Sequence, residues 1–231
     1  MTSAAFRTMA GAIIGSVFFV APAQAQLGGL MGKAKSAAGL GSSGSQAGTM
    51  SGDEADAFLE ASFRSTKNVL IATTLILQAV EKRGPLTGLK TRINAINSTS
   101  DPKEIGSFKS ALSANLQALD NRKEFAGDFQ TAYQAASAEE KKVLGIAVLN
   151  LAIGIARNVD LVGKAPQVVD AIKGNPKLLM RAGQFKTAAE LVALQGKGLA
   201  GISTSVPKLL AAAKVRAPKD AKTTNETPVT L

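Results

Sequence analysis

Histidine, cysteine and tryptophan are all absent from the 231-residue chain. Without histidine there is no Ser-His-Asp triad, no imidazole metal ligand and no imidazole general base. Without cysteine there is no thiolate nucleophile, no thiolate-bound metal and no disulfide. Catalysis would depend on carboxylates, lysine, serine or the single tyrosine, Tyr133. The sequence therefore predicts a non-enzymatic protein with no catalytic residues, no metal site and no cofactor.

Two patterns resemble catalytic groups but have simpler explanations. Ser205 and Lys208 fit the S-x-x-K pattern of penicillin-recognising enzymes, yet the companion S-D-N and K-T-G motifs are missing. A serine that caps a helix with proline in its first turn explains the same letters. Acidic residues also gather at two expected helix starts, where carboxylates complement the helix dipole. These acids are Asp53, Glu54, Asp56 and Glu60, and separately Glu139 and Glu140.

The first 25 residues have the order of a cleavable secretory signal peptide. Arg7 precedes an apolar run from Met9 to Val20, and Ala23-Gln24-Ala25 is a small-x-small cleavage pattern. The apolar run is too short to cross the ~30 Å core of a bilayer. We expect export to a periplasm of the Gram-negative type or, alternatively, to the extracellular space.

Composition divides the rest of the chain into three parts. Residues 26–50 are rich in glycine, serine and alanine and predict a flexible leader. Residues 51–216 carry the apolar periodicity of a single helical domain. Residues 217–231 contain two prolines and many polar residues, which predicts a disordered C-terminal tail.

Apolar residues recur at helical spacing throughout the predicted domain, and no segment alternates as a strand would. Ser51 and Glu54 form an S-x-x-E capping box, and the first helix is predicted to reach Arg83, before Gly84-Pro85. A shorter helix over 86–97 follows, and Asp101-Pro102 begins the next. One clean apolar stripe then comprises Ile105, Phe108, Leu112, Leu116 and Leu119.

A second capping box, Ser137 with Glu140, precedes an unusual helix over 143–156 that is apolar on every side except at Asn150. Helices of this kind lie buried at the centre of a domain. Glycine and proline predict that the central helix ends at 163–166 and that another helix begins at Pro176. Gly196, Gly198 and Gly201 are predicted to separate the last two helices. The fold class is therefore all-α, with about seven helices packed as an irregular bundle around the buried 143–156 helix.

The 143–156 helix also offers a candidate ligand site. Its 14 residues fall short of the ~18 needed to span a membrane, so we expect no transmembrane segment in the mature chain. Gly145 and Gly154 let neighbouring helices approach, or leave space for an apolar ligand. The candidate ligand-binding residues are Val143, Ile146, Leu149, Asn150, Ile153 and Gly154. A tightly packed bundle has the same sequence pattern.

The formal net charge is +10 and the basic residues are spread singly along the chain. Such a surface favours anionic partners. The expected partner is an envelope protein, or an anionic lipid or polysaccharide surface, and not nucleic acid, because the aromatic residues fall on the apolar stripes. We therefore expect an exported binding protein or a component of an envelope assembly. The alternatives are a periplasmic carrier of a lipid or other apolar small molecule and, least favoured, an enzyme without histidine or cysteine.

The predicted cleavage site can be checked directly. We expect the exported protein to begin at Gln26, immediately after Ala23-Gln24-Ala25. Intact-mass measurement and N-terminal sequencing of protein from the envelope fraction would establish the first residue. A mass equal to that of the complete chain would contradict cleavage.

Overall fold

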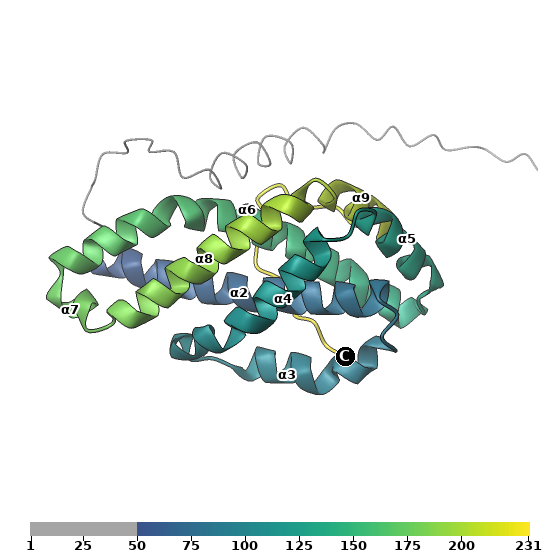
Figure 1. The fold of residues 1–231 in the computed structure, drawn as a ribbon, viewed down its shortest axis with the longest axis horizontal. Helices are drawn as coiled ribbons and strands as arrows, with labels where there is room; N and C mark the ends of the chain where they lie inside the picture. Colours follow the sequence, from purple (N-terminus) through teal and green to yellow (C-terminus); the bar gives the residue numbers. More distant parts are fainter. Residues whose placement is uncertain (1–49) are drawn as a thin grey trace, which may run out of the picture.

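The computed structural model describes residues 50–231, and the predicted signal peptide and leader, up to residue 49, lie outside the described residues. Over 50–231 the protein is all-α, as predicted. The two longest helices are α2 (Gly52–Val80) and α6 (Ala138–Gly174), which lie along each other for much of their length (Figure 1). The helices that complete the bundle are α3 (Lys90–Ser98), α4 (Lys109–Asp120), α5 (Phe125–Ala135), α7 (Pro176–Leu179), α8 (Ala182–Ser203) and α9 (Val206–Ala212).

Both predicted capping boxes are confirmed. The Ser51 hydroxyl accepts a hydrogen bond from the Glu54 backbone N–H, and the Glu54 carboxylate accepts one from the Ser51 N–H. Ser137 and Glu140 make the same reciprocal pair at the start of α6. Each box satisfies two backbone N–H groups that the first helical turn leaves without partners.

The end of α2 differs slightly from the prediction. The helix ends at Val80, and Lys82 adopts the left-handed conformation with φ of 52°. The Lys82 and Arg83 N–H groups donate to carbonyls of the last helical turn, which is a Schellman motif. Gly84, expected at that position, instead occupies the following turn with φ of 108°. Short 3-10 helices, Leu86–Leu89 and Pro102–Phe108, then precede α3 and α4.

The central helix is longer than the sequence indicated, because α6 continues through Gly163 and Pro166 to Gly174. Pro166 is exposed, so its ring faces solvent while the helix loses one hydrogen bond. Beyond the proline, Val168 and Ile172 are buried against residues of α2 and α8. This apolar burial offsets the missing hydrogen bond, and the predicted break at 163–166 is wrong.

Gly196, Gly198 and Gly201 also lie inside a helix, α8, and do not separate two helices. A Cβ atom built on Gly198 would lie 2.7 Å from the Cβ of Leu116 on α4. A Cβ on Gly201 would overlap the carboxylate of Asp120. Gly198 and Gly201 are present because α4 and α8 cross closely. The sequence alone could not distinguish a glycine required by close approach from a glycine that ends a helix.

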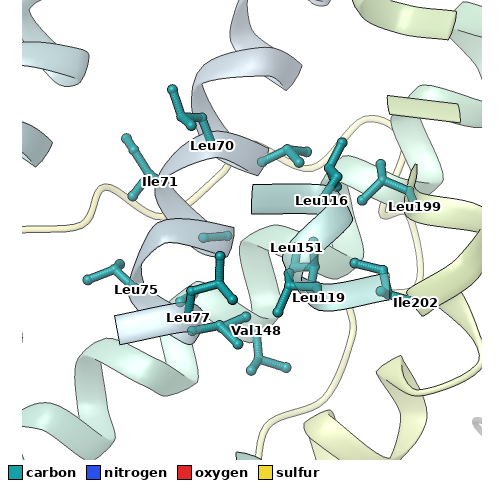
Figure 2. Packing of buried hydrophobic residues seen from close by; sticks show 14 of the residues in the cluster. Leu70, Ile71, Leu75, Leu77, Leu116, Leu119, Val148, Leu151, Leu199 and Ile202 are labelled. Atoms are coloured by element: carbon teal, nitrogen blue, oxygen red, sulfur yellow. The ribbon is translucent and has the colours of Figure 1, made fainter. Parts of the chain in front are cut away.

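The buried apolar residues form two clusters along the bundle. The larger contains the predicted stripe, which runs from the 3-10 helix Pro102–Phe108 into α4, together with residues of α2, α6, α8 and α9 (Figure 2). The smaller joins the first half of α2 to the second half of α6 and the first half of α8. Between them lies a layer of buried polar side chains, in which the Gln195 amide accepts from Ser65 and donates to Thr66.

The C-terminal residues also depart from the expectation of a disordered tail. In the structure residues 213–231 leave α9, turn, and run without helix to the C-terminus beside α3 (Figure 1). Ala221 and Val229 are buried, and Val229 belongs to the larger cluster. The segment is polar in composition, but two apolar side chains and several hydrogen bonds are enough to hold it.

The cap of α6 generates a pH-dependent prediction. Backbone N–H groups of Ser137 and Leu86 donate to the Glu140 carboxylate and hold the pKa of that carboxyl below its ordinary value. A depressed pKa in the folded state stabilises the fold above the pKa of the unfolded state, and this stabilisation is lost as the pH falls through the folded value. We expect Glu140→Gln to lower the free energy of unfolding by about 1 kcal/mol or less at pH 7.

The difference between wild type and Glu140→Gln should shrink as the pH falls from 6 to about 3, measured by urea denaturation at each pH. Glu139→Gln is the matched control, because Glu139 is exposed on the same turn. A difference in the free energy of unfolding that stays constant over this pH range would show that the Glu140 carboxylate does not stabilise the fold through its lowered pKa.

Candidate binding surfaces

The six residues predicted to line a ligand site all lie on α6, at helical spacings of three, four and seven that place them on one broad face. Val143 and Ile146 are half-buried and pack against the larger apolar cluster. Leu149 is half-buried, and Ile153 is fully buried. Asn150 and Gly154 have different neighbours, which are the backbone of Thr227 and the side chain of Val69.

The space beside the two glycines is filled by protein. A Cβ built on Gly154 would lie 2.6 Å from Cγ2 of Val69 on α2, well inside van der Waals contact. At Gly145 the neighbour is Cγ1 of Val215, 3.4 Å from the built Cβ. Both positions therefore lie in close contact with other parts of the chain, the first of the two possibilities that the sequence left open.

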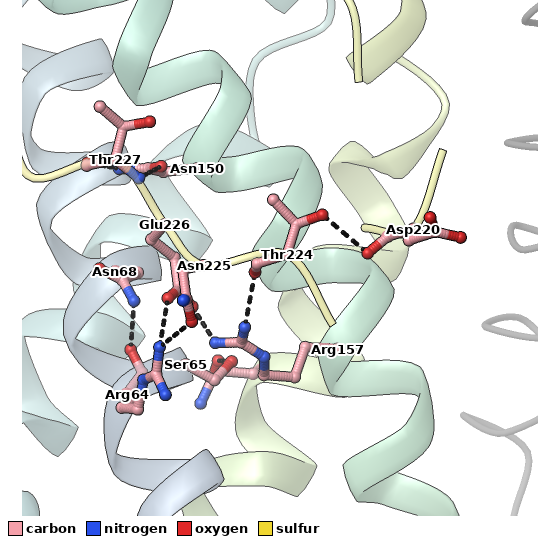
Figure 3. A network of polar contacts seen from close by, with 11 residues as sticks. Arg64, Ser65, Asn68, Asn150, Arg157, Asp220, Thr224, Asn225, Glu226 and Thr227 are labelled. Carbon is pink, nitrogen blue, oxygen red and sulfur yellow. Dashed lines mark hydrogen bonds and ion pairs between the residues drawn. The ribbon is translucent and has the colours of Figure 1, made fainter. Parts of the chain in front are cut away.

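Asn150 binds the backbone of the C-terminal segment. Its side-chain amide donates to the carbonyl of Thr227 at 2.7 Å, and its carbonyl accepts from the Thr227 N–H at 3.0 Å (Figure 3). One buried amide thus satisfies both backbone groups of one residue. The single polar residue in the apolar run of α6 has this segment as its partner.

Two arginines bind the residues that precede Thr227. Arg157 forms an ion pair with Glu226 and donates to the carbonyl of Thr224 at 3.0 Å. Arg64 on α2 donates to the Asn225 side chain at 2.7 Å and lies 3.4 Å from the Glu226 carboxylate (Figure 3). Burial and the neighbouring Arg64 charge lower the pKa of Arg157 from its ordinary value. Glu226 is the carboxylate that compensates these two charges, and sequence reasoning missed all three residues.

Three of the six acidic residues considered for catalysis or metal binding have structural partners. Glu54 and Glu140 cap α2 and α6, and Asp56 pairs with Arg181 at 2.6 Å. Residues 50–231 contain no group of three acidic side chains placed to hold a metal ion. Ser205 precedes α9 at the N-cap position, although its side chain makes no capping hydrogen bond.

A cationic surface lies on α9 and the loop after it. We use this name for Lys208, Lys214, Arg216, Lys219 and Lys222, all exposed. Within 208–222 the one acidic residue is Asp220, and none of the five cations forms an ion pair with the part of the chain that the structure describes. Lys214 adopts a left-handed conformation, with φ of 55°, in a Schellman motif that ends α9 and directs the loop away.

Several cations on other helices differ from these five because they form ion pairs with acidic side chains. Lys109 pairs with Glu190, Lys164 with Asp160, and Lys173 with Asp170. Positive charge is therefore less evenly distributed than its spacing along the sequence indicated. The density of cations over 208–222 was visible in the sequence, but their exposure and lack of acidic neighbours required the fold.

Helix α6 is the one helix of the described chain that is long and apolar enough to cross a membrane, and 72% of its most apolar window is buried within the domain. Comparison with protein families, curated proteins and solved structures finds no match to this chain.

The packing at Gly154 can be tested by adding one methyl group. We expect Gly154→Ala to lower the free energy of unfolding by about 1–3 kcal/mol, because the methyl group collides with Val69. Gly163→Ala on the same helix is the matched control, since no atom lies within 4 Å of its built Cβ. There alanine should stabilise the helix by up to about 1 kcal/mol.

Both variants would be measured by urea denaturation. If Gly154→Ala stabilised the protein as much as Gly163→Ala, the space beside Gly154 would be open and the carrier hypothesis would regain support.

Proposed function

We propose that this protein is an exported, non-enzymatic helical protein that attaches to anionic phospholipid surfaces of the cell envelope through its cationic surface. The observation that carries the proposal is the set of five exposed cations over 208–222, unpaired within the described chain and accompanied by one acid. Clusters of about four to eight lysine or arginine residues are attracted to anionic lipid headgroups.

The physical basis of the proposed attachment is electrostatic. The cationic surface contains no exposed large apolar residue, since Val169, Leu179 and Met180 are the residues of that kind in the described chain and lie elsewhere in it. Attachment should therefore be reversible and sensitive to salt, because exposed charges are screened beyond ~8 Å at physiological ionic strength and ~3 Å at 1 M salt.

The carrier and enzyme alternatives have less support. A carrier needs free volume beside α6, where Val69 and Val215 occupy the positions next to Gly154 and Gly145. Three of the six acidic residues considered for catalysis, Glu54, Glu140 and Asp56, take part in helix caps and an ion pair. Attachment to a surface needs neither a cavity nor a catalytic group.

The test is flotation of the chain from Gln26 with phosphatidylcholine vesicles, with and without about 30 mol% phosphatidylglycerol. We expect binding to the anionic vesicles alone and its loss near 1 M salt. Neutralising Lys208, Lys219 and Lys222 with glutamine should lower the bound fraction about fivefold or more, because it removes three of the five charges at the membrane.

The matched control removes the same charge elsewhere, by glutamine at Lys90, Lys103 and Lys177, which are exposed on other elements. It should change binding by less than about twofold. Equal loss in both triple variants would mean that net charge alone is responsible. Binding to an acidic polysaccharide but not to anionic vesicles would also contradict the proposal.

A further inference from the structure

Residues 224–231 lie against α2, α3 and α6 and form hydrogen bonds with side chains of all three helices, and the bonds to α2 and α6 are drawn in Figure 3. We call the surface that this segment covers the groove. The helices bind the backbone of this segment at three places. Asn150 binds both backbone groups of Thr227, Arg157 donates to the Thr224 carbonyl, and Asn97 on α3 donates to the Val229 carbonyl at 3.2 Å. Such hydrogen bonds are available to any extended chain, whatever its side chains.

Two side chains of the segment fit features of the groove. Glu226 lies between the guanidinium groups of Arg64 and Arg157, and its side chain is 6% exposed. Three residues later, Val229 is 3% exposed and enters the larger apolar cluster. Backbone hydrogen bonds combined with pockets for particular side chains are the usual way in which proteins recognise extended peptides.

The groove also requires an acidic occupant. Arg157 is buried and lies near the like charge of Arg64, so an empty groove would leave a desolvated cation without its partner. Simple opening of the segment is therefore unfavourable. Replacement by a second acidic peptide restores every contact, so exchange is favoured over an empty groove.

We infer that the groove between α2, α3 and α6 is a binding site for an extended peptide segment of a partner protein. The segment carries an acidic residue followed three positions later by an aliphatic residue. In the chain alone, residues 224–231 occupy the site as a tethered competitor. This site is separate from the cationic surface, since none of the five cations contacts the groove through a hydrogen bond or ion pair.

The experiment uses the chain from Gln26 with a site-specific protease sequence inserted between Lys219 and Asp220, which are both exposed. The protein folds intact and is then cut. A fluorescent peptide corresponding to residues 220–231 is added and its anisotropy measured. We expect saturable binding to the cut protein. Binding to the uncut protein should be about a hundredfold weaker, because the tethered segment competes at an effective concentration near millimolar.

Peptide variants test what the groove recognises. Glu226→Gln and Val229→Asp in the peptide should each weaken binding about tenfold or more, because each leaves a buried group without its partner. Thr230→Ala is the matched control, since Thr230 is exposed and makes no side-chain hydrogen bond to the described chain, and should bind as wild type. Asn150→Ala in the protein should weaken the binding of every one of these peptides by a similar factor.

A peptide that keeps the glutamate and valine but replaces the other side chains with serine and glycine decides whether a partner can bind. Binding within about tenfold of the native peptide supports a site for partners of this chemistry. Failure of this peptide to bind would show that the groove fits its own segment alone and would overturn the inference. Unfolding of the cut protein, seen by circular dichroism, would overturn it equally, because the segment would then be part of the core.

Discussion

The close contact between α2 and α6 is the constraint on which the rest of the structure depends. Gly154 of α6 faces Val69 of α2 without room for a single methyl group between them. This contact fixes the spacing of the two longest helices, and every other helix packs against one or both of them. The same close contact fills the region in which an apolar ligand would have to lie.

The two apolar clusters are separated by polar side chains, which fix the register of α2 and of α6 against α8. Ser65, Thr66 and Gln195 satisfy one another in the interior, and Asn158 donates to the Val192 carbonyl. A slip of one helix along the other would break these bonds and leave buried polar atoms unsatisfied, which is costly. Arg157 lies next to this layer and extends it toward the C-terminal segment, so the polar layer and the peptide groove are continuous.

Much of the fold could be predicted from local patterns. Both capping boxes, the stripe from Ile105 to Leu119 and the burial of the 143–156 helix follow from side-chain spacing alone. The errors share one cause, because Pro166 and Gly198 are helix breakers in isolation but lie within helices that their packing stabilises. The site that binds the C-terminal segment was harder to predict. Asn150 stood out in its apolar run, but Glu226 lies 76 positions away, and no local pattern connects the two.

The position of Glu226 so late in the sequence has a consequence for how the molecule matures. A chain synthesised from its N-terminus contains Arg64 and Arg157 long before it contains the carboxylate that neutralises them. The helices can assemble first, but the interior then holds a charge without its counter-ion. The ion pair can form only after residue 226 has been synthesised, which is after every helix described within residues 50–231. A chain interrupted shortly before residue 226 would have all its helices and still lack this final step of neutralisation.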